Sequence, residues 1–209
     1  MPLDQWDFTI VGEVDELRRW SWDEFRALPS EEITVDIHCV TKWSKLDTAW
    51  EGISVETLLN EVETSAEYLV AFCDGGYTTN LPVADVTDGK AWVAFAYDDE
   101  PLEAEHGGPA RLLVPHLYFW KSAKWVRGLD LREQNDPGFW ETNGYHLYGD
   151  PWLEQRFAGE YLVVGLHQHL LDHPDHRRCD LDLARASLDA AGRYRAQRDA
   201  YCRAQKTAR

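Results

Sequence analysis

Short β-rich runs bounded by turn residues fill most of the first 130 residues, and they limit the folds open to this chain. Alternating apolar and polar residues, with many β-branched and aromatic side chains, are typical of half-buried strands. Segments rich in Gly, Asp, Pro and Tyr separate these runs and predict long loops. We expect strands at residues 6–14, 32–40, 68–74, 91–97, 110–115 and 124–131, and loops at 73–82, 97–109 and 135–152.

Two short segments carry the start signals of helices. Ser21 precedes two acidic residues and Pro29 follows them, which predicts a short helix in between. Ser54 is placed to cap a second helix over residues 54–62. A chain dominated by strands, with a few short helices and long loops, belongs to the α+β class with mixed β-sheets.

The sequence changes character near residue 160. We expect residues 1–160 to form one domain and residues 161–209 to form a His-rich linker with a helical appendage, since alanine and arginine dominate after about Leu181. Four clustered histidines could bind a divalent metal, although such a run is more often a solvated linker. They are His167, His169, His173 and His176.

Composition excludes several classes of function. The net charge of −16 argues against nucleic acid as a partner, because duplex binding needs a basic face. No run of 18 apolar residues predicts a membrane span, and the N-terminus lacks the pattern of a signal peptide, so the cytoplasm is the expected compartment. The cysteines at 39, 73, 179 and 202 are too dispersed for a disulfide scaffold or a zinc knuckle.

Positive charge is concentrated in one stretch of this acidic chain. Between residues 46 and 110 the only Lys or Arg is Lys90. Such a concentration inside an acidic body suits an anion-binding site, whereas the alternative is that these cations pair with surface carboxylates. Five cations then follow within 22 residues: Arg111, Lys121, Lys124, Arg127 and Arg132.

Cys39 ends the expected strand at 32–40, beside His38 and before the residues Val-Thr-Lys-Trp-Ser. A thiolate projecting from a strand end into a loop region can act as a nucleophile or as a soft metal ligand. The alternative is a buried cysteine that serves as a small apolar side chain. These residues alone leave the choice open.

Five motifs in order resemble the molybdenum-cofactor domain of the sulfite oxidase family, which includes the catalytic subunits of protein-methionine-sulfoxide reductases. The resemblance covers about residues 6–157. Its motifs are DIHCVTKWS, DGGYTTNLPV, HGGPARLLVP, WKSAKWV and GFWETNGYHLYGDPW.

The resemblance implies a cofactor, Mo-molybdopterin, and a set of residues that hold it. Cys39 matches the family's protein ligand to molybdenum, with His38 beside it. His106, Arg111 and Lys124 match contacts to the pterin and its phosphate. The loop Ser122, Ala123 and Lys124 matches a segment around the phosphate, and Thr78 or Thr79 matches a hydroxyl donor to the pterin.

The resemblance also bears on the substrate. Tyr145 falls where sulfite oxidases place an active-site tyrosine, although it could instead pack on Trp140 and Trp152 as a loop aromatic. Sulfite oxidases follow their cysteine with an asparagine and arginines. Here Val40–Ser44 follow, which resembles the bacterial reductase branch, and Lys42 could still contribute one charge.

The sequence therefore predicts a molybdopterin-dependent oxidoreductase that moves an oxygen atom and two electrons on a small sulfite- or sulfoxide-like substrate. Without motifs for haem, iron–sulfur clusters or dinucleotides, we expect electrons to pass through a separate haem, flavin or iron–sulfur protein. The competing hypothesis is a non-catalytic module that binds an anion, a pterin or another protein.

Overall fold

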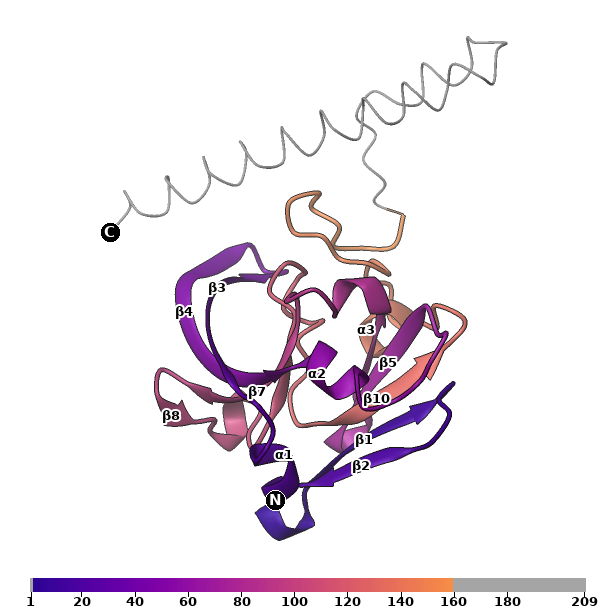
Figure 1. The fold of residues 1–209 in the computed structure, drawn as a ribbon. Coiled ribbons are helices and arrows are strands. Elements are labelled where there is room, and N and C mark those ends of the chain that lie inside the picture. Colours follow the sequence, from indigo (N-terminus) through magenta and orange to yellow (C-terminus); the bar gives the residue numbers. More distant parts are fainter. Residues whose placement is uncertain (1, 160–209) are drawn as a thin grey trace. The chain divides into compact units, whose positions relative to one another are not determined.

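Two β-sheets and their connecting loops make up the body of the protein. The computed structural model describes residues 2–159, of which residues 2–151 and 155–158 form one compact unit (Figure 1). The expected appendage at 161–209 and its four histidines lie outside the described residues, so the predicted boundary near residue 160 stays a prediction. No helix in the described part of the chain is both long and apolar enough to span a membrane.

The first sheet has five strands in the order β2-β1-β10-β5-β6. Strands β1 and β10 run parallel, and all other neighbours in this sheet are antiparallel. The strands are β1 (Asp7–Gly12), β2 (Arg18–Ser21), β5 (Tyr68–Cys73), β6 (Thr78–Pro82) and β10 (Val126–Arg132).

The second sheet is built around β7, which pairs with β4, β8 and β9. Strand β3 pairs with β4 in a long antiparallel hairpin that carries Cys39 near its turn. The strands are β3 (Glu31–Cys39), β4 (Trp43–Ser54), β7 (Trp92–Tyr97), β8 (Glu100–Pro101) and β9 (Arg111–Leu113).

The helices are short; the first two start where the sequence predicts, whereas the third lies in a segment expected to be a loop. Helix α1 (Trp22–Arg26) begins with a capping box between Ser21 and Glu24. Helix α2 (Val55–Leu59) follows Ser54, although that side chain makes no capping hydrogen bond. Helix α3 (Phe139–Thr142) lies in the long segment after β10. Four single 3₁₀ turns complete the described elements: Leu3–Gln5, Asp74–Gly76, Val83–Asp85 and Ala104–His106.

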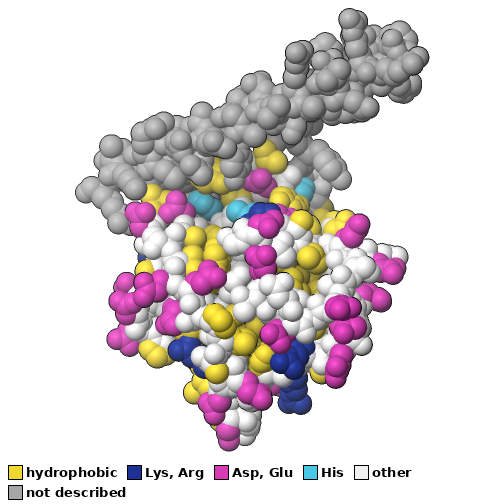
Figure 2. All heavy atoms as spheres, viewed as in Figure 1, with side chains coloured by type: hydrophobic (Ala, Val, Ile, Leu, Met, Phe, Trp, Pro, Cys, Tyr) yellow, Lys and Arg dark blue, Asp and Glu magenta, His cyan; other side chains and the backbone are white. Residues whose placement is uncertain are grey.

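Apolar side chains from both sheets form the main core, to which Phe8, Phe25, Ile53, Leu69 and Leu112 contribute. A smaller apolar cluster lies against the β3–β4 hairpin and includes Ile37, Trp50 and Leu113. On the face shown in Figure 2, acidic side chains are spread over the described surface, in keeping with the net charge. The sequence therefore folds as the predicted α+β domain with mixed sheets.

All six predicted strands are present, and four others were not predicted. β4 and β6 matter most, because β4 forms the second half of the Cys39 hairpin and β6 lies inside the segment expected to be a loop at 73–82. The short strands β2 and β8 complete the sheets at their edges.

Candidate cofactor site

Cys39 lies at the end of β3, next to a tight turn. Cys39 and Trp43 are directly paired across the β3–β4 hairpin, so only three residues form its loop. The backbone amide of Lys42 donates to the Cys39 carbonyl at 3.0 Å, and Lys42 has a φ of 69°. A turn followed by a left-handed residue is a common solution for three-residue hairpin loops. The Cys39 side chain is partly exposed at this turn, as a metal ligand requires.

His38 is buried beside Cys39, and its ring Nδ1 lies 2.7 Å from the Ser44 hydroxyl oxygen. Burial lowers the pKa of His38, and the nearby Asp36 opposes this shift only in part. The imidazole therefore stays neutral at physiological pH. The His38 ring thus joins the two strands of the hairpin one residue before Cys39.

The segment 117–124 connects Cys39 with the predicted anion site. The backbone amide of Phe119 donates to the His38 carbonyl at 2.8 Å, and Tyr118 forms a parallel bridge with His38. At its other end, the Ala123 carbonyl accepts from Leu112 in β9, the strand that carries Arg111. One loop thus fixes the distance between the two parts of the site.

Arg111 is a buried cation with an incomplete set of partners. Its side chain is only 3% exposed. The two terminal nitrogens donate to the carbonyls of His106 (2.9 Å) and Ser122 (2.7 Å), and the guanidinium lies 4.2 Å from the centre of the Phe119 ring. Its Nε is buried without a hydrogen-bond partner among the described residues, and burial lowers the pKa of Arg111 to about 10.

Lys124 lies close to Arg111 and is more exposed. Its Nζ donates to the Glu105 carbonyl at 2.6 Å. Burial and the positive charge of Arg111 both lower the pKa of Lys124, so an anion between the two cations would relieve their repulsion. Gly107 lets the neighbouring turn approach, because a Cβ at this position, with a φ of 107°, would lie 3.0 Å from the Lys124 side chain.

The five clustered cations divide into two kinds. Three form ion pairs with carboxylates: Arg127 and Arg132 do so near the surface, as the alternative predicts, whereas the pair of Lys121 is buried. For Arg111 and Lys124 the described residues supply carbonyl oxygens but no carboxylate within ion-pair distance. The three ion-paired cations are Lys121 with Glu141, Arg127 with Asp7 and Asp74, and Arg132 with Asp130 and Asp136.

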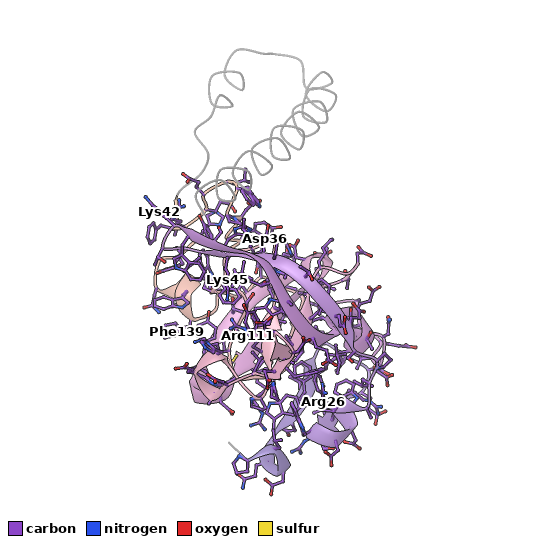
Figure 3. All side chains as sticks on the ribbon, turned by 90° about the vertical axis from the view of Figure 1, so that its left-hand side faces the viewer. Arg26, Asp36, Lys42, Lys45, Arg111 and Phe139 are labelled. Carbon is purple, nitrogen blue, oxygen red and sulfur yellow. The ribbon has the colours of Figure 1, made fainter. Side chains whose placement is uncertain are left out.

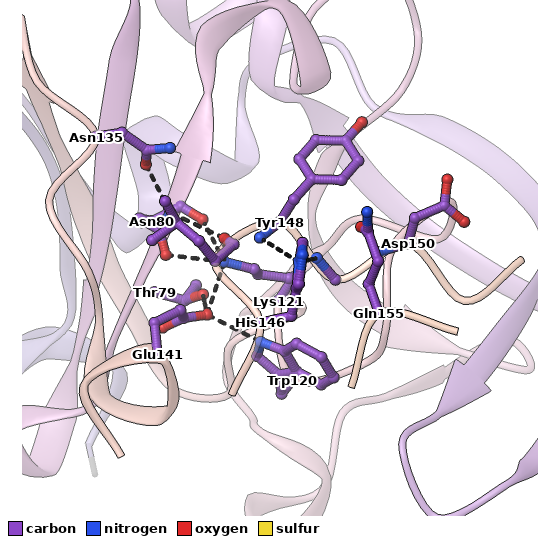
Figure 4. Close-up of polar contacts among 12 residues, drawn as sticks. Thr79, Asn80, Trp120, Lys121, Asn135, Glu141, His146, Tyr148, Asp150 and Gln155 are labelled. Atoms are coloured by element: carbon purple, nitrogen blue, oxygen red, sulfur yellow. Dashed lines mark hydrogen bonds and ion pairs between the residues drawn. The ribbon is translucent and has the colours of Figure 1, made fainter. Parts of the chain in front are cut away.

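Lys121 is the centre of a buried polar cluster that the sequence did not single out (Figure 4). Its ammonium group lies 2.6 Å from Glu141 Oε1 and donates to the Asn80 carbonyl, the Asn80 side-chain oxygen and the Leu147 carbonyl at 2.8–2.9 Å. Burial lowers the pKa of Lys121, while Glu141 acts in the opposite direction. This one side chain joins the 117–124 segment to β6, α3 and the loop before residue 149.

Tyr145 packs within a group of aromatic rings. Its ring centre lies 4.8 Å from that of Trp140, 5.1 Å from Trp120 and 5.5 Å from Phe157. Trp120 in turn stacks on Tyr118 and donates from its indole nitrogen to Glu141 at 2.9 Å. The contact with Trp140 agrees with the packing alternative. Through Trp120 and Tyr118, these rings also connect Tyr145 with the hairpin that carries Cys39.

The structure places the remaining predicted residues in different settings. Thr79 is fully buried and donates to Glu141 at 3.4 Å, whereas Thr78 is partly exposed. Ser122 and Ala123 are buried. The Ser122 amide donates to Phe119 and its hydroxyl oxygen accepts from Val114.

The backbone carbonyl of His106, rather than its ring, contacts Arg111. Its exposed ring lies 3.4 Å from the Glu105 carboxylate and 4.0 Å from Glu103. Figure 3 shows Arg111 inside the body and Lys42 at the end of the hairpin.

A partly exposed thiol and two cations for which the described residues supply no carboxylate partner are the kinds of group that an anionic cofactor with a soft metal would need. A family model described as an oxidoreductase molybdopterin binding domain matches residues 1–140. The chain belongs to this family, and the predicted cofactor, Mo-molybdopterin, is confirmed at the level of the family.

Individual relatives agree with this assignment. The chain is 45% identical over 158 residues to the uncharacterized oxidoreductase YuiH of Bacillus subtilis (strain 168), a match that covers 75% of this chain and 80% of YuiH. It is 25% identical over 169 residues to the protein-methionine-sulfoxide reductase catalytic subunit MsrP of Pseudomonas syringae pv. tomato, with 71% of this chain and 50% of MsrP covered.

The fold is also found in a solved structure. The sulfane dehydrogenase SoxCD from Paracoccus pantotrophus matches with a TM-score of 0.60 at 20% identity, covering 69% of this chain and 41% of that chain. This likeness confirms the predicted fold. The match to this chain spans half of MsrP and less than half of the SoxCD chain.

The residues present fit the cofactor of the family. A phosphate would supply the carboxylate-like partner that Arg111 and Lys124 lack, and the buried Nε of Arg111 is a donor still to be satisfied. Cys39 offers a soft sulfur ligand at the partly exposed end of the same assembly. These observations concern the chain's own groups, and each is independent of the family match.

Proposed function

We propose that this protein is a Mo-molybdopterin oxidoreductase that transfers an oxygen atom and two electrons on a small sulfite- or sulfoxide-like substrate. Cys39 would ligate the molybdenum, while Arg111 and Lys124 would bind the terminal phosphate. The observation that carries the proposal is the buried Arg111 guanidinium, which has no carboxylate partner among the described residues. The bound cofactor supplies the two-electron chemistry.

The chain's own residues would position the reaction. The hairpin turn and His38 hold Cys39, and the 117–124 segment sets its distance from the two cations. Between the two threonines, Thr78 fits a pterin contact better, because the Thr79 hydroxyl is buried on Glu141. Tyr145 would donate from its phenol to the oxygen atom being transferred.

The sulfoxide alternative has two supports. MsrP is named a protein-methionine-sulfoxide reductase, and the residues after Cys39 lack the arginines expected of a sulfite oxidase. A separate electron-transfer protein and a cytoplasmic location remain part of the proposal. We also propose that the residues from about His167 onward are dispensable for the chemistry.

The anion site can be tested by removing the Arg111 charge while keeping its bulk. We expect Arg111→Met to be purified with far less molybdopterin than the wild type, because each charge-assisted hydrogen bond contributes about 1.5–3 kcal/mol, or roughly tenfold to a hundredfold in affinity. The measurement is pterin content per chain, with the melting temperature as a check on folding.

Arg18→Met is the matched control, because Arg18 is an exposed arginine of strand β2 that pairs with Glu61. Equal pterin content in Arg111→Met and Arg18→Met would place the anion site elsewhere. A non-catalytic module would bind an anion at Arg111 and still show no turnover with any sulfite- or sulfoxide-like substrate.

Removal of the Tyr145 hydroxyl tests its contact with the substrate. Tyr145→Phe keeps the ring contacts with Trp120 and Trp140, so stability should change little. If the phenol donates mainly in the transition state, kcat and kcat/KM should fall together by about tenfold or more. Steady-state kinetics with an artificial electron donor measures both constants. Values within twofold of the wild type would return Tyr145 to a packing role.

A further inference from the structure

The turn after Cys39 brings a hydroxyl group to the cysteine sulfur. Thr41 Oγ1 lies 3.1 Å from Cys39 Sγ. The three-residue loop fixes this approach, because Cys39 and Trp43 are paired on either side and Lys42 closes the turn onto the Cys39 carbonyl. The backbone conformation of the loop therefore places the Thr41 hydroxyl next to the sulfur.

The direction of this hydrogen bond follows from the charge on the sulfur. With a neutral thiol, either group could donate. A thiolate, which is the form that binds a metal, carries no proton, so the Thr41 hydroxyl must then be the donor. Within residues 2–159, the sulfur of Cys39 is the one partner seen for this hydroxyl.

A backbone-capping role explains the contact less well. A threonine that stabilises a turn accepts from or donates to nearby backbone groups. Here the backbone closes its own turn through Lys42, and the hydroxyl is directed to sulfur instead.

We propose that Thr41 is a positioning residue that donates a hydrogen bond to the Cys39 thiolate and thereby raises the reduction potential of the metal bound there. This inference rests on the proposed ligation by Cys39. A hydrogen bond to a ligand sulfur draws electron density away from the metal, which favours the reduced state. Thr41 would thus set how readily the site accepts electrons without touching the substrate.

The test compares three variants of the loaded protein. Thr41→Val keeps the shape and removes the donor, Thr41→Ser keeps the donor, and Thr34→Val changes an exposed threonine elsewhere on β3. A redox titration followed by the electron paramagnetic resonance signal of molybdenum gives the midpoint potentials. This readout does not depend on turnover.

We expect Thr41→Val to lower the potentials, and Thr41→Ser and Thr34→Val to match the wild type. A hydrogen bond of about 1 kcal/mol changes the equilibrium about fivefold, which corresponds to about 40 mV for a one-electron couple. Equal potentials in Thr41→Val and the wild type would overturn the inference. So would a shift in Thr41→Ser as large as that in Thr41→Val.

A second measurement uses cofactor-free protein and separates this inference from the proposed function. Loss of the donor to the Cys39 sulfur should change the rate at which iodoacetamide alkylates this residue at a fixed pH by about twofold. Peptide mapping identifies the alkylation of Cys39 separately. Cys73 should stay unreactive, because burial raises the pKa of its thiol to about 12. Unchanged alkylation of Cys39 would show that the hydrogen bond is absent, whereas a wild-type protein without molybdenum would contradict the proposed function instead.

Discussion

A Cys39→Ser variant should stay folded and keep its pterin while losing turnover by more than about a hundredfold. Serine is a harder and far less acidic ligand than cysteine, and even outer-sphere changes at metal sites cost about tenfold to a hundredfold. The pterin should remain because Arg111 and Lys124, at the other end of the 117–124 segment, are unchanged.

Turnover, pterin content and the thiolate-to-molybdenum absorption band are the measurements for this variant. Cys73→Ser is the control, because Cys73 is a buried cysteine on β5 that the proposal gives no role. Turnover of Cys39→Ser equal to that of the wild type would remove Cys39 from the metal site, as would an unchanged absorption band.

Breaking the buried Lys121–Glu141 pair should have the largest effect on stability. Lys121→Met leaves the Glu141 carboxylate buried without its cation, and loss of one partner from such a pair costs about 3–5 kcal/mol. For a protein of this size, that lowers the melting temperature by roughly 6–20 °C. Thermal unfolding by circular dichroism measures the change.

The double variant Lys121→Met/Glu141→Leu separates the charge from the packing. If the loss of stability comes from the buried, unpaired Glu141 carboxylate, replacing both partners with apolar side chains should recover much of the stability. Arg18→Met, which breaks the exposed pair with Glu61, should change stability little. A melting temperature of Lys121→Met within 2 °C of the wild type would show that the pair does not hold the 117–124 segment in place.

Much of the fold could be predicted because several of its strands are apolar and buried, while others alternate between buried and more exposed side chains. Residues 91–97 and 68–74 contribute mostly buried side chains, and continuous apolar runs indicate such strands clearly. Strand β4 was missed because its first half, with Lys45 and Asp47, exposes polar side chains on a hairpin. Strand β6 was missed because Asn80 and Pro82 are typical of loops, although Asn80 here binds Lys121.

The site was predicted in outline, and the pairing of its charges was not. The sequence shows five cations in one region. It could not predict that Lys121 pairs with Glu141 while Arg111 has carbonyl partners, because these contacts join distant segments of the chain. Thr41 gave no sequence signal, because its contact with Cys39 depends on a three-residue loop, and therefore on finding β4. Both omissions are properties of tertiary structure.

The most direct test of the central claim is the molybdenum content of the purified wild-type protein, produced in a host that makes the cofactor. The account predicts one molybdenum per chain, together with a phosphate-bearing pterin and an absorption band from Cys39 thiolate to molybdenum. A well-folded protein that contains neither molybdenum nor pterin would contradict it.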